Sequence, residues 1–191
     1  MFREDLTSKK TNDLKKMIGC KIKSIIHCSQ DTFDSFNEEE LYNISQNEFF
    51  KYASGPVVFV LEDLEVGFTS NEKLNSIVTW TESNGLLRSE DYFRNDSDFL
   101  LIENSNKEFT GEREQSLSGQ IISSIQILRF PPPTTNYEGL PNEMGVCIRF
   151  ENNNHIVMSH KLIDSPDSFC VTYLDEINPE KLELSTISSI I

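Results

Sequence analysis

The feature that most constrains the fold is a strand pattern that occurs twice along the chain. Three pairs of segments match in the same order, namely 18–26 with 118–126, 57–70 with 146–159, and 76–80 with 168–173. In the first pair Gly, Ile, Ser and Ile fall at matched positions. Such self-similarity predicts two related structural units. We therefore expect one domain over residues 1–191, with pseudo-repeat halves at about 14–103 and 114–178.

Hydrophobic residues alternate with polar ones along these segments, which is typical of half-buried strands. In the first segment Cys20, Ile22, Ile26 and Cys28 are expected on one face, opposite Lys21, Lys23 and His27. In the second half Val146, Ile148 and Phe150 are expected opposite Cys147, Arg149 and Glu151. The aromatic residues at strand positions are interpreted as core, namely Phe59, Phe68, Trp80, Phe169 and Tyr173.

Two hairpins are predicted from their turn residues. Asn152–Asn154 favours a turn because Asn tolerates the left-handed conformation and bonds to nearby backbone. The return strand is expected at His155–His160, and Asp63–Glu65 should turn the matching hairpin of the first half. A further strand is expected at Asp98–Glu103.

The halves differ in what joins their first two strands. In the first half, the acidic start and helical spacing of residues Asn37–Ala53 predict a helix capped by Asn37. In the second half, the three prolines at 131–133 favour an extended loop over 131–145. A short helical turn is expected after Pro179, before a tail at 184–191. The fold class is α+β, predominantly antiparallel β-sheet with two related halves and one main inserted helix.

No spacing typical of a catalytic, metal or cofactor site is present. The chain lacks CxxC, HExxH and GxSxG motifs, and eight glycines are too few for a phosphate-binding loop. The histidines are interpreted as surface residues, and His155 and His160 point to opposite faces of their strand. The four cysteines are expected to be reduced, buried small hydrophobes. We therefore expect no cofactor, no metal and no enzyme activity.

The charge is strongly negative and unevenly placed. The net charge is −14; residues 1–23 hold seven bases and three acids, whereas the remaining 168 hold ten bases and 28 acids. This field disfavours nucleic acid and attracts a basic partner, although a solubilising coat is the alternative. The absence of an apolar run of 18 residues and of a signal-like start favours a cytoplasmic protein without membrane contact.

Candidate partner-binding residues are acidic clusters and one loop tyrosine. No Lys or Arg occurs between Lys23 and Lys51, whereas six carboxylates do. The predicted contact residues are Asp31, Asp34, Glu38, Glu39, Glu40, Glu62, Asp63, Glu65 and Tyr137. Tyr137 is included because an extended Pro-rich loop loses little entropy on docking, with a simple exposed connector as the alternative.

The second half carries a family resemblance. SLSGQIISSIQILRF, MGVCIRFENNNHIVMSHKLIDSPDSF and VTYLDEI together cover about 70 residues. Their order of strand, polar hairpin, Asp-x-x-Asp-x-Phe loop and last strand resembles immunity proteins encoded beside bacterial polymorphic or contact-dependent toxins. The resemblance implies binding and blocking a cognate toxin domain, and it transfers no active-site residue.

Three functions remain open at this point. The first is an immunity protein that occludes the basic site of a cognate toxin, most simply a nuclease, with acidic side chains in place of phosphates. The second is a nucleic-acid-mimicking inhibitor of a host defence nuclease. The third is a small-ligand binder or enzyme whose site is assembled from distant residues.

Overall fold

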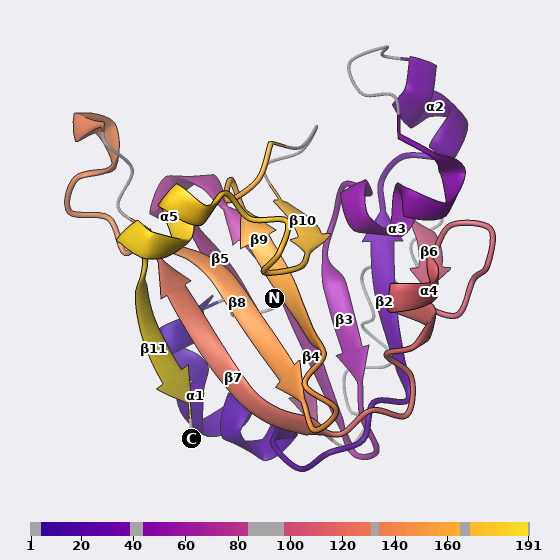
Figure 1. The fold of residues 1–191 in the computed structure, drawn as a ribbon, viewed down its shortest axis with the longest axis horizontal. Coiled ribbons are helices and arrows are strands. Elements are labelled where there is room, and N and C mark those ends of the chain that lie inside the picture. The colour runs from indigo at the N-terminus through magenta and orange to yellow at the C-terminus, as the bar shows by residue number, and fades with distance from the viewer. Residues whose placement is uncertain (1–4, 39–43, 84–97, 131–133, 165–168, 191) are drawn as a thin grey trace.

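A computed structural model describes residues 5–38, 44–83, 98–130, 134–164 and 169–190. These residues form two antiparallel sheets and short helices, so the predicted α+β fold dominated by antiparallel sheet is confirmed (Figure 1). The α-helices are α1 Thr11–Leu14, α2 Phe33–Glu38, α3 Phe49–Tyr52, α4 Glu112–Gln115 and α5 Pro179–Leu184. Over the described part of the chain, no helix has the length and apolar character needed to cross a membrane.

The first sheet contains six strands in the order β1-β5-β4-β3-β2-β6. They are β1 Asp5–Leu6, β2 Ser24–Ser29, β3 Val57–Val60, β4 Leu64–Asn71, β5 Ser76–Ser83 and β6 Leu100–Glu103. Strands β2 to β5 form an antiparallel meander, and β6 returns to pair with the other edge of β2. The strand predicted near 98–103 is thus present as β6.

The second sheet contains five strands in the order β10-β9-β8-β7-β11. They are β7 Ile122–Arg129, β8 Glu143–Phe150, β9 His155–His160, β10 Phe169–Thr172 and β11 Thr186–Ile190. Again four strands form a meander and a fifth returns beside the first. The tail expected at 184–191 therefore contains β11, the counterpart of β6, with Ile190 buried in the core.

The two halves meet through backbone bonds that follow a local two-fold axis. Gly19 N donates to Ile122 O at 2.8 Å, and Gly119 N donates to Ile22 O at 2.8 Å. The inner pair of bonds runs from Ile22 N to Gln120 O (2.9 Å) and from Ile122 N to Cys20 O (3.1 Å). In each pair, the two bonds join equivalent residues of the two halves, whose numbers differ by one hundred. The relation between the two halves stays a prediction.

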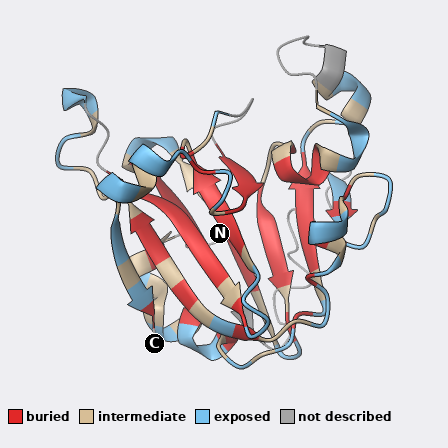
Figure 2. Ribbon diagram, viewed as in Figure 1, coloured by how far each residue is buried: buried red, intermediate tan, exposed pale blue. Residues whose placement is uncertain are grey.

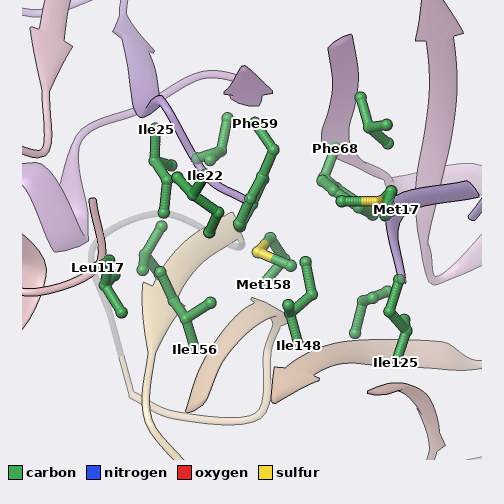
Figure 3. Close-up of a cluster of buried hydrophobic side chains, with 14 of the residues drawn as sticks. Met17, Ile22, Ile25, Phe59, Phe68, Leu117, Ile125, Ile148, Ile156 and Met158 are labelled. Atoms are coloured by element: carbon green, nitrogen blue, oxygen red, sulfur yellow. The ribbon is translucent and has the colours of Figure 1, made fainter. Parts of the chain in front are cut away.

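The main core lies between the inner faces of the two sheets. Ile25, Phe59 and Phe68 from the first sheet face Ile148, Ile156 and Met158 from the second (Figure 3). The strands are buried through most of their length, whereas the connecting segments are exposed (Figure 2). The five strand aromatics predicted as core are all buried. Trp80 is 6% exposed, and each of the others is 2% exposed or less.

The face predicted for the first strand is wrong beyond Ile22. Ile22 and Ile25, three residues apart, both belong to the main core, whereas Ile26 and Cys28 pack with Trp80 on the other face. Regular alternation starts only at Ser24, because residues 19–23 form the irregular corner between the halves. His27, expected on a polar face, is fully buried because its ring packs against Phe50 of α3 and Phe169 of β10. The alternation predicted for 146–151 is confirmed, with Cys147 in a separate outer cluster.

That outer cluster covers the second sheet. Leu128 and Cys147 pack there with Leu182 of α5. The helix begins as predicted, with Pro179 in its first turn and the Asn178 side chain accepting a hydrogen bond from Glu180 N at 2.9 Å. No disulfide joins the four cysteines; three are buried, and the expectation of burial fails only for Cys20, which is half-buried.

The single helix predicted over Asn37–Ala53 is wrong. α2 already begins at Phe33, so Asn37 lies inside it and is not its cap. Ser45 is extended (φ −76°, ψ 149°) and caps a 3₁₀ helix, Gln46–Glu48, that leads into α3. A Ser followed three residues later by Glu forms a capping box, which starts a new helix instead of continuing an old one. Phe49 is buried, as predicted.

The hairpin turn predicted in the second half is present at the predicted residues, and the turn of the first half lies slightly earlier than predicted. Asn153 has φ +66°, and Asn152 Oδ1 accepts from Asn154 N at 3.0 Å, so the Asn152–Asn154 turn and the strand after it are confirmed. In the first half, Glu62 and Asp63 form the tip, whereas Glu65 lies within β4 opposite Val60. Glu65 is therefore a strand residue.

The loop expected over 131–145 is shorter and less extended than predicted. Residues 143–145 already belong to β8, and Thr135–Tyr137 form a turn of 3₁₀ helix. The prolines at 131–133 lie outside the described residues.

Candidate partner-binding site

The strand topology gives the molecule two different ends. The β2–β3 and β7–β8 connections emerge at one end of the molecule, and we call this end the insert end. Its two sheets are joined by Glu143 N, which donates to Ser76 Oγ at 2.9 Å, and by the ion pair of Lys161 with Glu72 (2.5 Å). At the opposite end, the hairpin end, lie the β3–β4 and β8–β9 turns and the paired segments at 19–22 and 119–122. The connections and the turns occupy opposite sides of Figure 1.

Asp31, Asp34 and Glu38 lie at the insert end. Asp31 is half-buried and its carboxylate accepts a hydrogen bond from Ser54 Oγ, which ties the start of the insert to its end. Asp34 is exposed in the first turn of α2, and Glu38 belongs to the same helix. Glu39 and Glu40 lie outside the described residues. The described part of the predicted acidic cluster is thus anchored and faces solvent at Asp34.

A cluster of four phenylalanines holds α2 in place. The ring of Phe49 in α3 lies 5.6 Å from Phe33, 5.5 Å from Phe36 and 5.6 Å from Phe109, in edge-to-face arrangements. Phe50 N donates to Phe109 O at 2.9 Å. Edge-to-face aromatic pairs stabilise beyond the area that they bury. The cluster therefore brings the 104–111 segment beside the acidic insert.

This contact adds carboxylates that the sequence did not associate with the insert. Glu108 and Glu112 are exposed, and Glu108 Oε1 accepts a hydrogen bond from Gln46 Nε2 at 2.7 Å. Their separation of about 60 residues from Gln46 hides this neighbourhood from any local pattern. The α2, α3 and α4 helices lie along one flank of the fold (Figure 1). Glu108 and Glu112 are exposed there together with Lys107 and Arg113.

Tyr137 also lies at the insert end, in the β7–β8 connection. It is half-buried, and Lys161 Nζ lies 5.5 Å from its ring centre. Asn142 Nδ2 donates to Tyr137 O at 3.1 Å and to Leu140 O at 3.0 Å, so one amide fixes the loop backbone. The predicted recognition loop therefore has a defined conformation over its described residues.

A buried polar chain fixes Asn142 in turn. Asn75 Nδ2 donates to Asn142 Oδ1 at 2.8 Å, and His160 Nε2 contacts Asn75 Oδ1 at 3.1 Å. Asn75 and His160 are fully buried, and Asn142 is 8% exposed. The chain crosses from β9 through the start of β5 to the loop, so both sheets hold the loop.

Glu62, Asp63 and Glu65 lie at the hairpin end, away from the other predicted contact residues. Glu62 and Asp63 are exposed at the turn, and Lys23 Nζ donates to Glu62 O at 3.3 Å. Lys15, Lys16 and Lys21 are further exposed bases in the segments that lead into this end. The structure therefore divides the predicted contact set between two ends of the molecule.

A second polar cluster joins α3 of the first half to the end of β10. Lys51 Nζ contacts Glu176 Oε1 at 2.6 Å, and Glu176 Oε2 accepts from Thr172 Oγ1 at 2.7 Å. Burial alone lowers the pKa of Lys51, but the hydrogen bond and charge of Glu176 outweigh burial and raise that pKa overall. Lys51 is therefore a structural cation.

The same cluster fixes the linker between the halves. Arg113 makes two bonds to the Asp175 carboxylate (3.1 and 2.9 Å) and stacks 3.6 Å over the Tyr173 ring. The hydrogen bond from Arg113 holds the pKa of Asp175 below its ordinary value. Each group already has a partner in the other half or the linker, so the cluster is interpreted as a clamp between halves.

The histidines differ from their predicted surface position. His27 and His160 are buried, and His155 is half-buried with its Nε2 accepting from Leu174 N at 2.8 Å. Burial lowers the pKa of His155. Among the described residues, no three His, Cys, Asp or Glu side chains are grouped in a way that could hold a metal ion.

No protein-family model, curated protein or solved structure matches this chain.

Proposed function

We propose that this chain is an immunity protein, which binds a cognate bacterial toxin domain and covers its basic site. The proposal takes its class from the strand resemblance of the second half. A nuclease is the toxin class that fits best, because a nuclease binds its phosphate substrate through Lys and Arg that carboxylates can also engage. Binding and neutralisation take place in the cytoplasm, and the chain itself carries out no chemical step.

The observation that supports the proposal most is the uneven placement of exposed charge. Asp34, Glu108 and Glu112 are exposed on the insert end and its flank. Of the bases of that region, Lys51 and Arg113 are engaged by Glu176 and Asp175, and Lys107 is exposed. A basic partner is therefore drawn to this surface, whereas the lysines before and within the hairpin end oppose its approach there.

The geometry also favours occlusion by a rigid surface. The phenylalanine cluster fixes α2, and the Lys51–Glu176 pair fixes α3 against the second sheet. A surface that is ordered before binding loses little conformational entropy when it docks. Tight inhibition by this face therefore needs no rearrangement of the sandwich.

Co-expression with the toxin domain encoded in the adjacent reading frame tests the proposal. We expect cell survival and a co-eluting complex on a sizing column, with association slowed by salt as surface charges are screened. A D34K/E112K variant should slow association. The control E62K/D63K at the hairpin end makes the same change in net charge and should not. Cell death with the unmodified protein, without any complex, contradicts the proposal.

A further inference from the structure

His155, the first residue of β9, supplies the acceptor for one backbone amide of the turn that follows β10. Leu174 N donates to His155 Nε2 at 2.8 Å. An imidazole nitrogen accepts a hydrogen bond only while it carries no proton, so the neutral ring holds its proton on Nδ1. Protonation of the ring turns Nε2 into a donor that faces another donor. The bond to Leu174 therefore exists only while His155 is neutral.

The turn held by this bond carries the second-half side of the clamp between the halves. Asp175 binds Arg113 of the linker, and Glu176 binds Lys51 of α3. Leu174 directly precedes these two carboxylate residues. A change in how the Leu174 amide is held therefore reaches both the linker and α3.

A carboxylate that suits the protonated ring lies beside the amide that the ring would release. His155 Nε2 is 3.7 Å from Asp175 Oδ1, and the same oxygen accepts from Arg113 at 2.9 Å. The half-buried imidazole is in edge-to-face contact with the Tyr173 ring, 6.1 Å away between centres. Because a charged N–H binds a carboxylate strongly, a protonated Nε2 competes with Arg113 for this oxygen.

Burial and four charged groups decide the pH at which the ring is protonated. Burial has the largest effect and lowers the pKa of His155 below its ordinary value. Two arginines lower the pKa further and two carboxylates raise it, namely Arg149 of β8, Asp175, Arg113 and Glu176 in order of effect. Because the pKa is lower in the folded protein than in the unfolded chain, the stabilisation by the neutral ring is complete above about pH 6.5. It is lost as the pH falls through the lowered pKa.

We propose that His155 is a pH-sensitive latch of the clamp. At neutral pH its ring holds the turn through Leu174 N, and protonation releases that amide and draws Nε2–H toward the Asp175 carboxylate. The clamp then loosens at the turn on which both α3 and the linker depend. The latch is a property of the fold and does not depend on whether the chain binds a toxin.

Nitrogen-15 chemical shifts of the His155 ring in the full-length protein test the latch directly. At pH 8 we expect the tautomer with its proton on Nδ1 and none on Nε2. As the pH falls, the hydrogen-exchange protection factor of the Leu174 amide should decrease by about 3- to 10-fold, as the loss of one hydrogen bond allows. This decrease should have the same midpoint as the titration of the ring.

Three variants separate the latch from a general effect of acid. His155→Gln removes the titrating ring, so the protection of the Leu174 amide should no longer follow the wild-type midpoint. Asp175→Asn removes a carboxylate that attracts the protonated ring and should move the midpoint of His155 to lower pH. The matched control Glu180→Gln removes one negative charge at an exposed position of α5 and should move that midpoint less.

A proton on Nε2 at pH 8 overturns the proposal, because such a ring cannot accept from Leu174 N. A protection factor that does not follow the protonation of the ring, or that falls equally in His155→Gln, overturns it as well. Equal midpoints in Asp175→Asn and Glu180→Gln contradict the part assigned to the carboxylate. If His155→Gln does not fold, the tautomer and the titration of the unmodified protein still decide.

Discussion

The Tyr173 hydroxyl donates a 2.6 Å hydrogen bond to the Glu114 carboxylate, joining β10 of the second half to the linker between the halves. Both side chains are buried, and the other Glu114 oxygen accepts from Gly111 N at 2.9 Å. Burial and the adjacent carboxylate raise the pKa of Tyr173, so the hydroxyl remains a donor throughout the ordinary pH range.

Tyr173→Phe should therefore destabilise the fold although it removes only one oxygen atom. The buried Glu114 carboxylate loses a donor, which costs about 1–3 kcal/mol. Urea unfolding measures the change in the free energy of unfolding. Tyr52→Phe, the same change at a half-buried position, serves as the control and should alter stability by less than about 0.5 kcal/mol. Equal effects of the two substitutions contradict a special role for the bond.

Gly55→Ala should be strongly destabilising because the residue approaches the β2 backbone. Gly55 has φ +135°, and an added Cβ would lie 1.9 Å from Cys28 O. The strained φ alone costs about 1–3 kcal/mol, and the displaced backbone adds to this. Gly139→Ala is the matched control, since Gly139 also has positive φ (+79°) but no atom within 4 Å of the added Cβ. Thermal unfolding should show a clearly larger loss at Gly55; similar losses would refute the close approach.

Gly67→Ala should disturb the single tryptophan of the chain. Gly67 lies opposite Trp80 in the β4–β5 ladder, and an added Cβ would lie 1.9 Å from the indole ring. Trp80 is 6% exposed, so a displaced ring becomes more hydrated and its fluorescence emission should shift to longer wavelength. Thr69→Ala in the same strand, where the paired residue is Val78 and the substitution adds no atom, should leave the spectrum unchanged. An unshifted Gly67→Ala spectrum in a folded protein contradicts this packing.

Where local chemistry decides the structure, the sequence was sufficient. The Asn152–Asn154 turn, the following strand and the helix after Pro179 each depend on residues within a few positions, and all three are confirmed. The broken helix near Ser45 was also accessible, because the Ser45–Glu48 capping box is visible in the sequence.

Where distant segments meet, local pattern was insufficient. β2 has both faces buried, so alternation could not reveal that His27 points away from solvent. The spacing of the predicted acidic clusters does not show where they lie relative to one another, and antiparallel pairing of β2 with β3 sends Asp31 and Glu62 to opposite ends. The acidic flank at Glu108 depends on the Phe49–Phe109 contact, which only the tertiary fold creates.

His27 should make stability depend on pH in a window that begins above the range where carboxylates titrate. Burial lowers its pKa from 6.5 to about 4, although bonds to the Phe50 and Gly55 carbonyls act in the opposite direction. As the pH falls, the His27 imidazole is therefore protonated at a higher pH in the unfolded chain than in the folded protein. The stabilising contribution is complete above pH 6.5 and is lost as the pH falls toward 4, by about 3 kcal/mol in total.

Urea unfolding at several pH values between 8 and 5 measures the part of this loss that falls above pH 5. His27→Gln removes the titrating group, so the variant should start less stable at pH 8 but lose less stability on acidification than the unmodified protein. His155, whose pKa is also lowered by burial, remains in both proteins and cancels in the comparison. An imidazole signal of His27 that titrates near its ordinary pKa, or parallel pH profiles of the two proteins, would show that the ring is not held neutral by burial.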